Sequence, residues 1–150
     1  MNPDFSEMLS AFSAEGVEYL LVGAYAVAVH GLPRATGDLD LWVGTEGENP
    51  KRVRRALERF GAALDQLTLK DLTQRDVVFQ IGVAPRRIDV MTSIDGVEFA
   101  RAWGRRMDTK LEGLTVHVLS RDDLIRNKKA AGRPQDLADV AWLEGRQEQG

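Results

Sequence analysis

The sequence predicts an α+β fold in which helices flank a single mixed β-sheet, built as one domain by residues 1–150. Three observations lead to this prediction. Short apolar runs of strand length alternate with segments whose apolar residues recur at helical spacing. Glu112-Gly113 separates two strand-like segments and indicates a hairpin. A chain of 150 residues, 43% of them apolar, is long enough for one core and too short for two.

The first predicted elements are a helix, a strand and a second helix. Residues 4–15 carry apolar side chains at helical spacing, and the segment ends at Gly16. The apolar run 18–22 is typical of a buried strand, which Gly23 ends. The small side chains of residues 24–29 favour a closely packed helix directly after this glycine.

The middle of the chain predicts further strands and one amphipathic helix. Pro50 is suited to the first turn of that helix, because proline needs no amide partner there. Pro85 lies between two apolar runs, which indicates a hairpin. In order, we expect a strand at 38–43, a helix at 51–60, a short helix or loop at 62–73, and strands at 77–83 and 86–91.

The last third predicts a hairpin followed by two helices. Ser120 is suited to cap a helix that has acidic residues in its first turn, and Gly132 ends that helix. In its final helix we expect Leu137 to face the interior, and we expect the tail after Gly145 to fray. In order, we expect a short helix at 96–103, strands at 105–111 and 114–119, and helices at 120–131 and 134–144.

The composition excludes several classes of protein. Without cysteine there is no disulfide framework and no thiolate zinc site. A net charge of −3 and a pI near 5.4 argue against broad binding to DNA, which needs a basic face. No apolar stretch approaches the ~20 residues that span a bilayer, and the first residues carry no signal peptide. We therefore expect a cytoplasmic protein with no membrane partner.

Three aspartates on two predicted strands are the most informative residues. Asp38 and Asp40 lie two apart, so their side chains point to the same face of a strand. Asp89, on a later strand, would complete a cage of three carboxylates. Such a cluster repels itself unless a cation lies among its members, and hard oxygen ligands suit Mg²⁺. For the Asp-x-Asp pair taken alone, solvated carboxylates at a strand end are the alternative.

The segment from Gly23 to Asp40 combines two features of a nucleotide site. The helix that follows the glycine offers free N–H groups and the positive end of a dipole, which suit phosphate. The strand that follows this helix presents the two carboxylates that suit a metal ion. A phosphate cradle beside paired carboxylates is what binding of a metal-chelated nucleotide needs.

The wider pattern resembles the nucleotidyltransferase superfamily typified by DNA polymerase β. The resemblance lies in Leu-Val-Gly-Ala-Tyr at 21–25, Gly-Asp-Leu-Asp-Leu at 37–41 and the later Asp89. The stretches 124–128 and 132–139 are similar to the Lys and Arg-x-x-Asp-x-x-Asp motifs of small bacterial nucleotidyltransferases. These relatives include the toxin components of type IV toxin–antitoxin systems. The resemblance implies a fold like the polymerase β palm.

The resemblance also implies an activity. A nucleoside monophosphate would pass from an NTP such as ATP to a hydroxyl of RNA (tRNA among them), a protein or a small molecule, with release of pyrophosphate. Two Mg²⁺ ions, or Mn²⁺ in their place, would be held by Asp38 and Asp40 together and by Asp89 at one ion, and these three would be the catalytic residues. An antitoxin-like protein or a second copy of the chain would be the partner. The nucleotide would contact Gly23, Ala24, Arg34, Thr36, Lys128 and Asp136.

Several of these residues have a second interpretation. Ala24 departs from the family pattern, which has Ser or Gly after the first Gly, and alanine has no hydroxyl for a terminal phosphate. The alternative function is therefore a weakly active or inactive nucleotide-binding or partner-binding module. Lys128 and Arg34 would then be solvated basic residues, and Asp136 would be a partner for a helix dipole.

Overall fold

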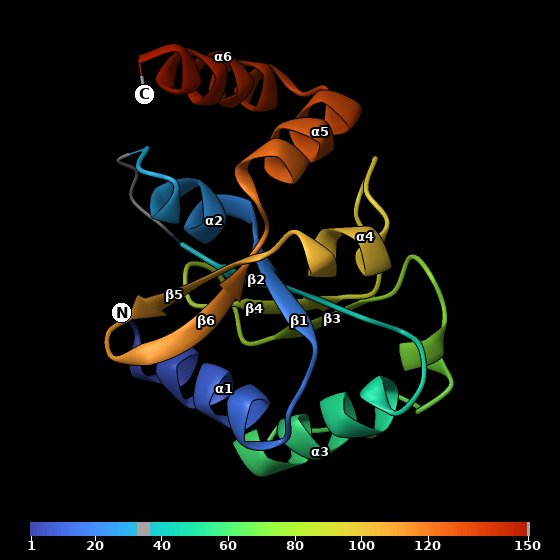
Figure 1. The fold of residues 1–150 in the computed structure, drawn as a ribbon. Helices are drawn as coiled ribbons and strands as arrows, with labels where there is room; N and C mark the ends of the chain where they lie inside the picture. Colours follow the sequence, from blue (N-terminus) through green and yellow to red (C-terminus); the bar gives the residue numbers. More distant parts are fainter. Residues whose placement is uncertain (33–36, 150) are drawn as a thin grey trace.

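The computed structural model describes residues 1–32 and 37–149, and within them the strands form one mixed six-stranded sheet with helices around it (Figure 1). The strands follow the order β3-β4-β2-β1-β6-β5. They are β1 (Tyr19–Val22), β2 (Leu39–Val43), β3 (Val78–Ile81), β4 (Ile88–Met91), β5 (Met107–Leu111) and β6 (Leu114–Val118). The helices are α1 (Pro3–Ala14), α2 (Gly23–Val29), α3 (Asn49–Phe60), η1 (Asp71–Thr73), α4 (Phe99–Gly104), α5 (Arg121–Ala131) and α6 (Pro134–Gln149).

The sheet confirms the predicted α+β class. Strand β2 runs antiparallel to β1 and parallel to β4, and β1 runs parallel to β6. The expected hairpins are present as the antiparallel pairs β3–β4 and β5–β6. Because β1 and β2 occupy the centre of the sheet, their side chains are buried on both faces, and the one strand position there that carries a charge is Asp40.

Helices cover both faces of the sheet (Figure 1). On one face lie α1 and α3, where the ring of Phe12 meets Tyr19 edge-on at 5.4 Å. On the other face lies α4, whose Phe99 ring meets Trp42 edge-on at 5.1 Å. Strand alternation places Trp42 on the same face as Asp40, so the sheet presents a carboxylate and an aromatic core to the α4 side.

The last helix differs from its prediction in two ways. It continues to Gln149, where we expected a frayed tail after Gly145, because this stretch holds no proline and is rich in good helix formers. Leu137, expected to face inward, is 53% exposed. The buried face of α6 instead carries two carboxylates at helical spacing that pair with Lys128; its members are Asp136, Asp139, Val140 and Leu143.

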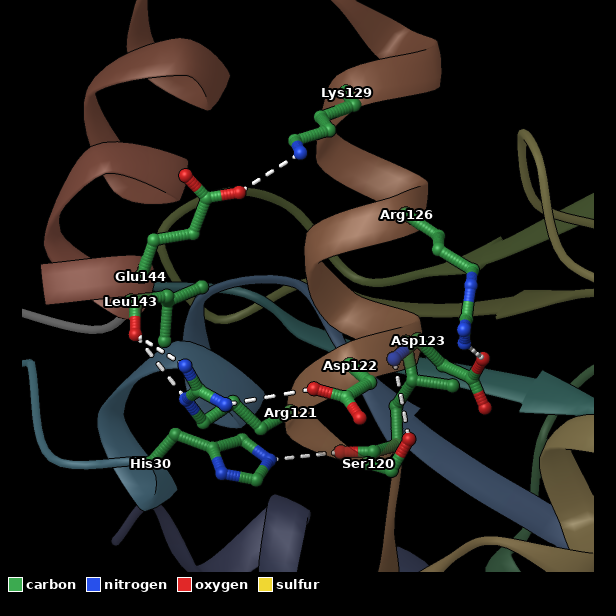
Figure 2. A network of polar contacts seen from close by, with 10 residues as sticks. His30, Ser120, Arg121, Asp122, Asp123, Arg126, Lys129, Leu143 and Glu144 are labelled. Atoms are coloured by element: carbon green, nitrogen blue, oxygen red, sulfur yellow. Dashed lines mark hydrogen bonds and ion pairs between the residues drawn. The ribbon is translucent and has the colours of Figure 1, made fainter. Parts of the chain in front are cut away.

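Polar contacts fix the start of α5 to its neighbours (Figure 2). The Ser120 hydroxyl accepts a hydrogen bond from the Asp123 amide at 3.2 Å, as expected for a cap. Arg121 donates to the carbonyl of Leu143 at 2.7 Å, which joins α5 to α6. The ring of His30, at the end of α2, bonds the Leu119 carbonyl at 2.8 Å. None of the helices in the described part of the chain is both long and apolar enough to cross a membrane.

Candidate active site

Asp40 lies in the middle of the sheet, between its two neighbouring strands. Its backbone pairs with Val22 of β1 on one side and with Asp89 of β4 on the other. In a sheet, paired residues point to the same face, so the carboxylates of Asp40 and Asp89 stand side by side. Asp38 directly precedes β2 on the same face. The structure thus brings together three aspartates, two of which, Asp38 and Asp89, are 51 positions apart in the sequence.

Gly23 is packed directly against the Asp40 side chain. A Cβ atom at this position would lie 2.1 Å from Oδ2 of Asp40, closer than any real contact. The backbone φ of Gly23 is +67°, a conformation that side-chain-bearing residues rarely adopt. Glycine is therefore needed here for two reasons, and it lets the start of α2 approach the carboxylate. The roles predicted for Gly23 and Ala24 in binding phosphate stay predictions.

Arg87 holds two of the three carboxylates together. Its Nε donates to Oδ1 of Asp89 at 2.8 Å, and its Nη2 reaches Oδ2 of Asp89 at 3.2 Å. The same Nη2 lies 3.2 Å from Oδ2 of Asp38, whose Oδ1 accepts the Arg87 backbone amide at 3.1 Å. A single guanidinium thus places positive charge at the point where Asp38 and Asp89 meet.

The surroundings of Asp40 disfavour its charged form. The pKa of its carboxyl group is raised from 3.8 to about 7, first by burial and then by the negative charges of Asp89 and Asp38. Arg87 acts in the opposite direction on this pKa but does not offset the other causes. Asp40 is therefore a carboxylate that a second cation nearby would stabilise.

The three aspartates have the chemistry to bind a divalent cation, but Arg87 forms ion pairs with two of them, Asp38 and Asp89. Within residues 1–32 and 37–149, no three Asp, Glu, His or Cys side chains are arranged so that they would hold a metal ion as they stand. The donor set itself is three carboxylates on adjacent strands, which suits Mg²⁺. Burial, and after it the charges of Asp89 and Asp38, raise the pKa of Asp40, so a cation at the cluster would favour its charged form. The carboxylates of Asp38, Asp40 and Asp89 thus suit Mg²⁺ by their chemistry, provided that the guanidinium of Arg87 leaves the oxygens it now contacts.

A pocket of about 400 Å³ opens beside Asp40. We call it the Asp40 pocket. Its lining comes from the sheet, from the segment that follows β4 and from the C-terminal part of α5 with the residue that precedes α6, so it receives groups from distant parts of the sequence. Asn127 and Arg133 face it from the α5–α6 region, and the amide of Asn127 donates to the Asp95 carbonyl at 3.0 Å. Its lining includes Gly23, Asp40, Ser93, Asp95, Asn127 and Arg133.

Lys128 and Asp136, both predicted to serve the nucleotide, lie in a buried charge cluster between α5 and α6. The Lys128 ammonium lies 2.9 Å from Oδ2 of Asp139 and 3.3 Å from Oδ1 of Asp136. Arg133 Nε donates to the other oxygen of Asp136 at 2.7 Å, and these cations lower the pKa of Asp136. As placed, the lysine joins two helices. Its contact with a triphosphate stays a prediction.

Two predicted residues lie outside the described part of the chain, and sequence reasoning missed two others. Arg34 and Thr36 fall among residues 33–36, which the structure does not describe. The missed residues are Arg87 and Asn127, whereas Arg133 belongs to the motif at 132–139 but was given no role of its own. For Arg87 a signal was present, because its spacing of two from Asp89 on a strand predicts a shared face.

The fold and the carboxylate cluster define the class of protein, and comparison with known families agrees. A mixed sheet flanked by helices, with aspartates on two parallel neighbouring strands beside a glycine-started helix, is consistent with the nucleotidyltransferase fold. A family model described as "Nucleotidyltransferase of unknown function (DUF6036)" matches residues 5–144, so the chain belongs to this family. No curated protein matches the sequence.

Proposed function

We propose that the chain transfers a nucleoside monophosphate from a Mg²⁺-bound nucleoside triphosphate to a hydroxyl group and releases pyrophosphate. The observation that carries the proposal is the meeting of Asp38, Asp40 and Asp89 on one face of the sheet, next to the Asp40 pocket. Membership of a nucleotidyltransferase family supports the same class of reaction.

Asp38, Asp40 and Asp89 are the residues that would hold the metal. When bound, Mg²⁺ neutralises charge on the phosphate oxygens and orients them for in-line displacement. Until then, Arg87 keeps Asp38 and Asp89 close together against their mutual repulsion. Its guanidinium must leave the oxygens that bind the ion. The Arg87 side chain is 33% exposed, so it has solvent to move into.

The transfer replaces a phosphoanhydride bond of the NTP with a phosphoester bond to the acceptor. The hydroxyl oxygen of the acceptor bonds to the α-phosphorus while the bond from that phosphorus to the pyrophosphate oxygen breaks. The hydroxyl proton passes to a carboxylate, for which Asp89 is our candidate, and from there to solvent. Catalysis of this kind consists mainly of positioning and charge stabilisation.

The Asp40 pocket is our candidate site for the donor nucleotide. It adjoins Asp40, so a triphosphate in it would present its α-phosphorus to the cluster. The Arg133 side chain is 76% exposed although one edge of its guanidinium contacts Asp136, and its planar N–H groups suit phosphate oxygens. ATP is our first candidate donor, and the guanidinium of Arg133 would contact the phosphates that all NTPs share.

A second candidate function is a nucleotide-binding or partner-binding module with little or no activity. Ala24 favours it, because a backbone without a neighbouring hydroxyl binds a terminal phosphate less well. The acceptor, an antitoxin-like partner and a paired second copy remain proposals that rest on the resemblance of residues 132–139 and on the small size of the chain.

One experiment separates the two functions. The protein is incubated with Mg²⁺, each of the four NTPs labelled at the α-phosphate, and total RNA or cell lysate. We expect label on an acceptor and release of pyrophosphate, both lost in Asp40→Asn and retained in Asp65→Asn, which alters an exposed loop carboxylate. Magnesium-dependent NTP binding without transfer would favour the module. Equal transfer by Asp40→Asn would exclude the proposed mechanism.

A further inference from the structure

A second cavity, of about 440 Å³, lies on the same face of the sheet as Asp40. We call it the aromatic pocket. Trp42 forms its floor, and strand geometry puts this residue about 7 Å along β2 from Asp40. The two cavities share Ser93, which lines both. Neither the family description nor the proposed function assigns a role to this cavity.

Three aromatic side chains form one wall of the aromatic pocket. Phe99 and Trp103 of α4 stack with ring centroids 5.9 Å apart, and Phe99 meets Trp42 edge-on at 5.1 Å. The guanidinium of Arg106 already lies 3.9 Å above the Trp103 ring. Arg106 does not line the pocket, but its position shows that the Trp103 ring attracts a cation, and aromatic surfaces of this kind attract organic cations.

The charged residues around the aromatic pocket are mainly acidic. Glu18, Glu46 and Glu98 line it, against the single guanidinium of Arg75. Glu98 makes a long contact of 3.6 Å with Arg101, whereas Glu18 and Glu46 have no ion pair with any other described residue. This balance disfavours a phosphate-bearing ligand such as an RNA end, because the lining would repel it. It favours a ligand with a positive charge.

A buried donor adds a second requirement. Trp42 is 1% exposed, and its indole N–H has no acceptor among the described residues. A buried donor without an acceptor costs about 1–3 kcal/mol. A ligand that brings an oxygen to Trp42 would remove this cost, so the pocket suits a molecule with a hydroxyl as well as a cationic group.

We propose that the aromatic pocket binds a small organic cation: a protonated amine on an apolar body that also carries a hydroxyl. The carboxylates meet the amine, the Phe99–Trp103 wall meets the apolar body, and Trp42 lies on the side toward Asp40. This binding does not depend on nucleotidyl transfer. A further role rests on the proposed function: because Ser93 lines both cavities, a cation bound here would be the acceptor if its hydroxyl reaches past Ser93 into the Asp40 pocket.

A matched series of probes tests the binding. 2-Amino-1-phenylethanol, 1-phenylethanol and mandelate share a phenyl ring and a hydroxyl, and they differ in carrying a positive, no or a negative charge. Binding is followed by tryptophan fluorescence in Trp142→Phe, which leaves Trp42 and Trp103 as the emitters, and by calorimetry on the unaltered chain. We expect the amine to bind about tenfold more tightly than the neutral alcohol, and mandelate to bind more weakly than either.

Variants locate the site. Glu46→Gln and Glu98→Gln each remove an exposed carboxylate of the lining and should weaken amine binding about three- to fivefold, as expected for a partly solvated ion pair. Glu58→Gln, which alters an exposed carboxylate on α3 outside the lining, should leave it unchanged. Equal affinity for the three probes, or equal effects of Glu46→Gln and Glu58→Gln, would overturn the proposal.

A last comparison keeps this proposal separate from the proposed function. Asp40→Asn should abolish nucleotidyl transfer and leave the affinity for 2-amino-1-phenylethanol within twofold of the unaltered chain. Amine binding with no transfer by any variant would count against the proposed function alone. Transfer to another acceptor with no preference for the amine probe would count against the aromatic pocket alone.

Discussion

Replacing Asp40 with asparagine should stabilise the protein at high pH and have little effect at low pH. The folded chain raises the pKa of Asp40 from 3.8 to about 7, mainly by burial and then by the charges of Asp89 and Asp38. Between these two pH values the folded chain keeps a proton that the unfolded chain loses. Folding is then coupled to proton uptake, so the free energy of unfolding falls as the pH rises through this range and levels off above pH 7.

The pKa rise sets the size of the effect. A rise from 3.8 to about 7 corresponds to at most about 4 kcal/mol, and screening around a partly exposed group reduces this to about 2–3 kcal/mol. Asparagine keeps the shape of the side chain and carries no charge. Asp40→Asn should therefore exceed the unaltered chain in stability by about 2–3 kcal/mol at pH 8.5, and by less than about 0.5 kcal/mol at pH 3.5.

Urea unfolding followed by circular dichroism, in buffers free of divalent cations, measures both values. Asp65→Asn serves as the control, because that carboxylate lies exposed in a loop and should change stability little at either pH. A stability difference for Asp40→Asn that is the same at both pH values would refute the reasoning. So would a loss of stability at pH 8.5, which would show that the charge of Asp40 is needed to hold the fold.

Three further substitutions test the packing around the site. Gly23→Ala should lower the free energy of unfolding by about 2–3 kcal/mol, because its Cβ would meet Asp40, and the cost should shrink in the double variant with Asp40→Ala. Lys128→Met should cost about 3 kcal/mol in urea unfolding, because it removes the ammonium that contacts buried Asp136. Arg87→Met should move the pKa of Asp40 still higher, as followed by carboxyl carbon NMR, because Arg87 lowers it.

Each of these predictions has a result that contradicts it. Additive costs for Gly23→Ala and Asp40→Ala would show that the two residues do not collide. Lys129→Met is the matched control for Lys128→Met, since Lys129 makes an exposed ion pair with Glu144 at 2.8 Å; equal costs would place Lys128 on the surface. An unchanged pKa of Asp40 in Arg87→Met would mean that the guanidinium does not act on the cluster.

The sequence predicted which residues form the carboxylate cluster, but it did not predict the ion pairs that two of them make with Arg87. Strand alternation alone puts Asp38 and Asp40 on one face. Their meeting with Asp89 depends on the parallel pairing of β2 with β4, which the family resemblance implies and local sequence does not. The bridge formed by Arg87 depends further on side-chain contacts across that pair, so no spacing rule could have predicted which carboxylates it joins.

The C-terminal helices show the opposite case, in which a local pattern was wrong. Leu137 was expected inside, as ordinary hydrophobicity predicts, and Asp136 was expected to contact the nucleotide or to be a partner for a helix dipole. In the structure Leu137 is exposed and Asp136 is buried, because α6 packs on α5 through the ion pairs of Lys128. The face of α6 that is buried is determined by the positive charge of Lys128 on α5. The sequence of α6 alone therefore could not predict it.

The central claim is that Asp38, Asp40 and Asp89 exchange Arg87 for a divalent cation when a nucleotide binds. Crystals grown with Mn²⁺ and a non-hydrolysable NTP would test it through the anomalous signal of manganese. We predict a manganese peak bonded to Asp40 and at least one other aspartate, with the Arg87 guanidinium moved away and the triphosphate in the Asp40 pocket. A bound nucleotide with Arg87 still joining Asp38 to Asp89, and no manganese at the cluster, would contradict the account.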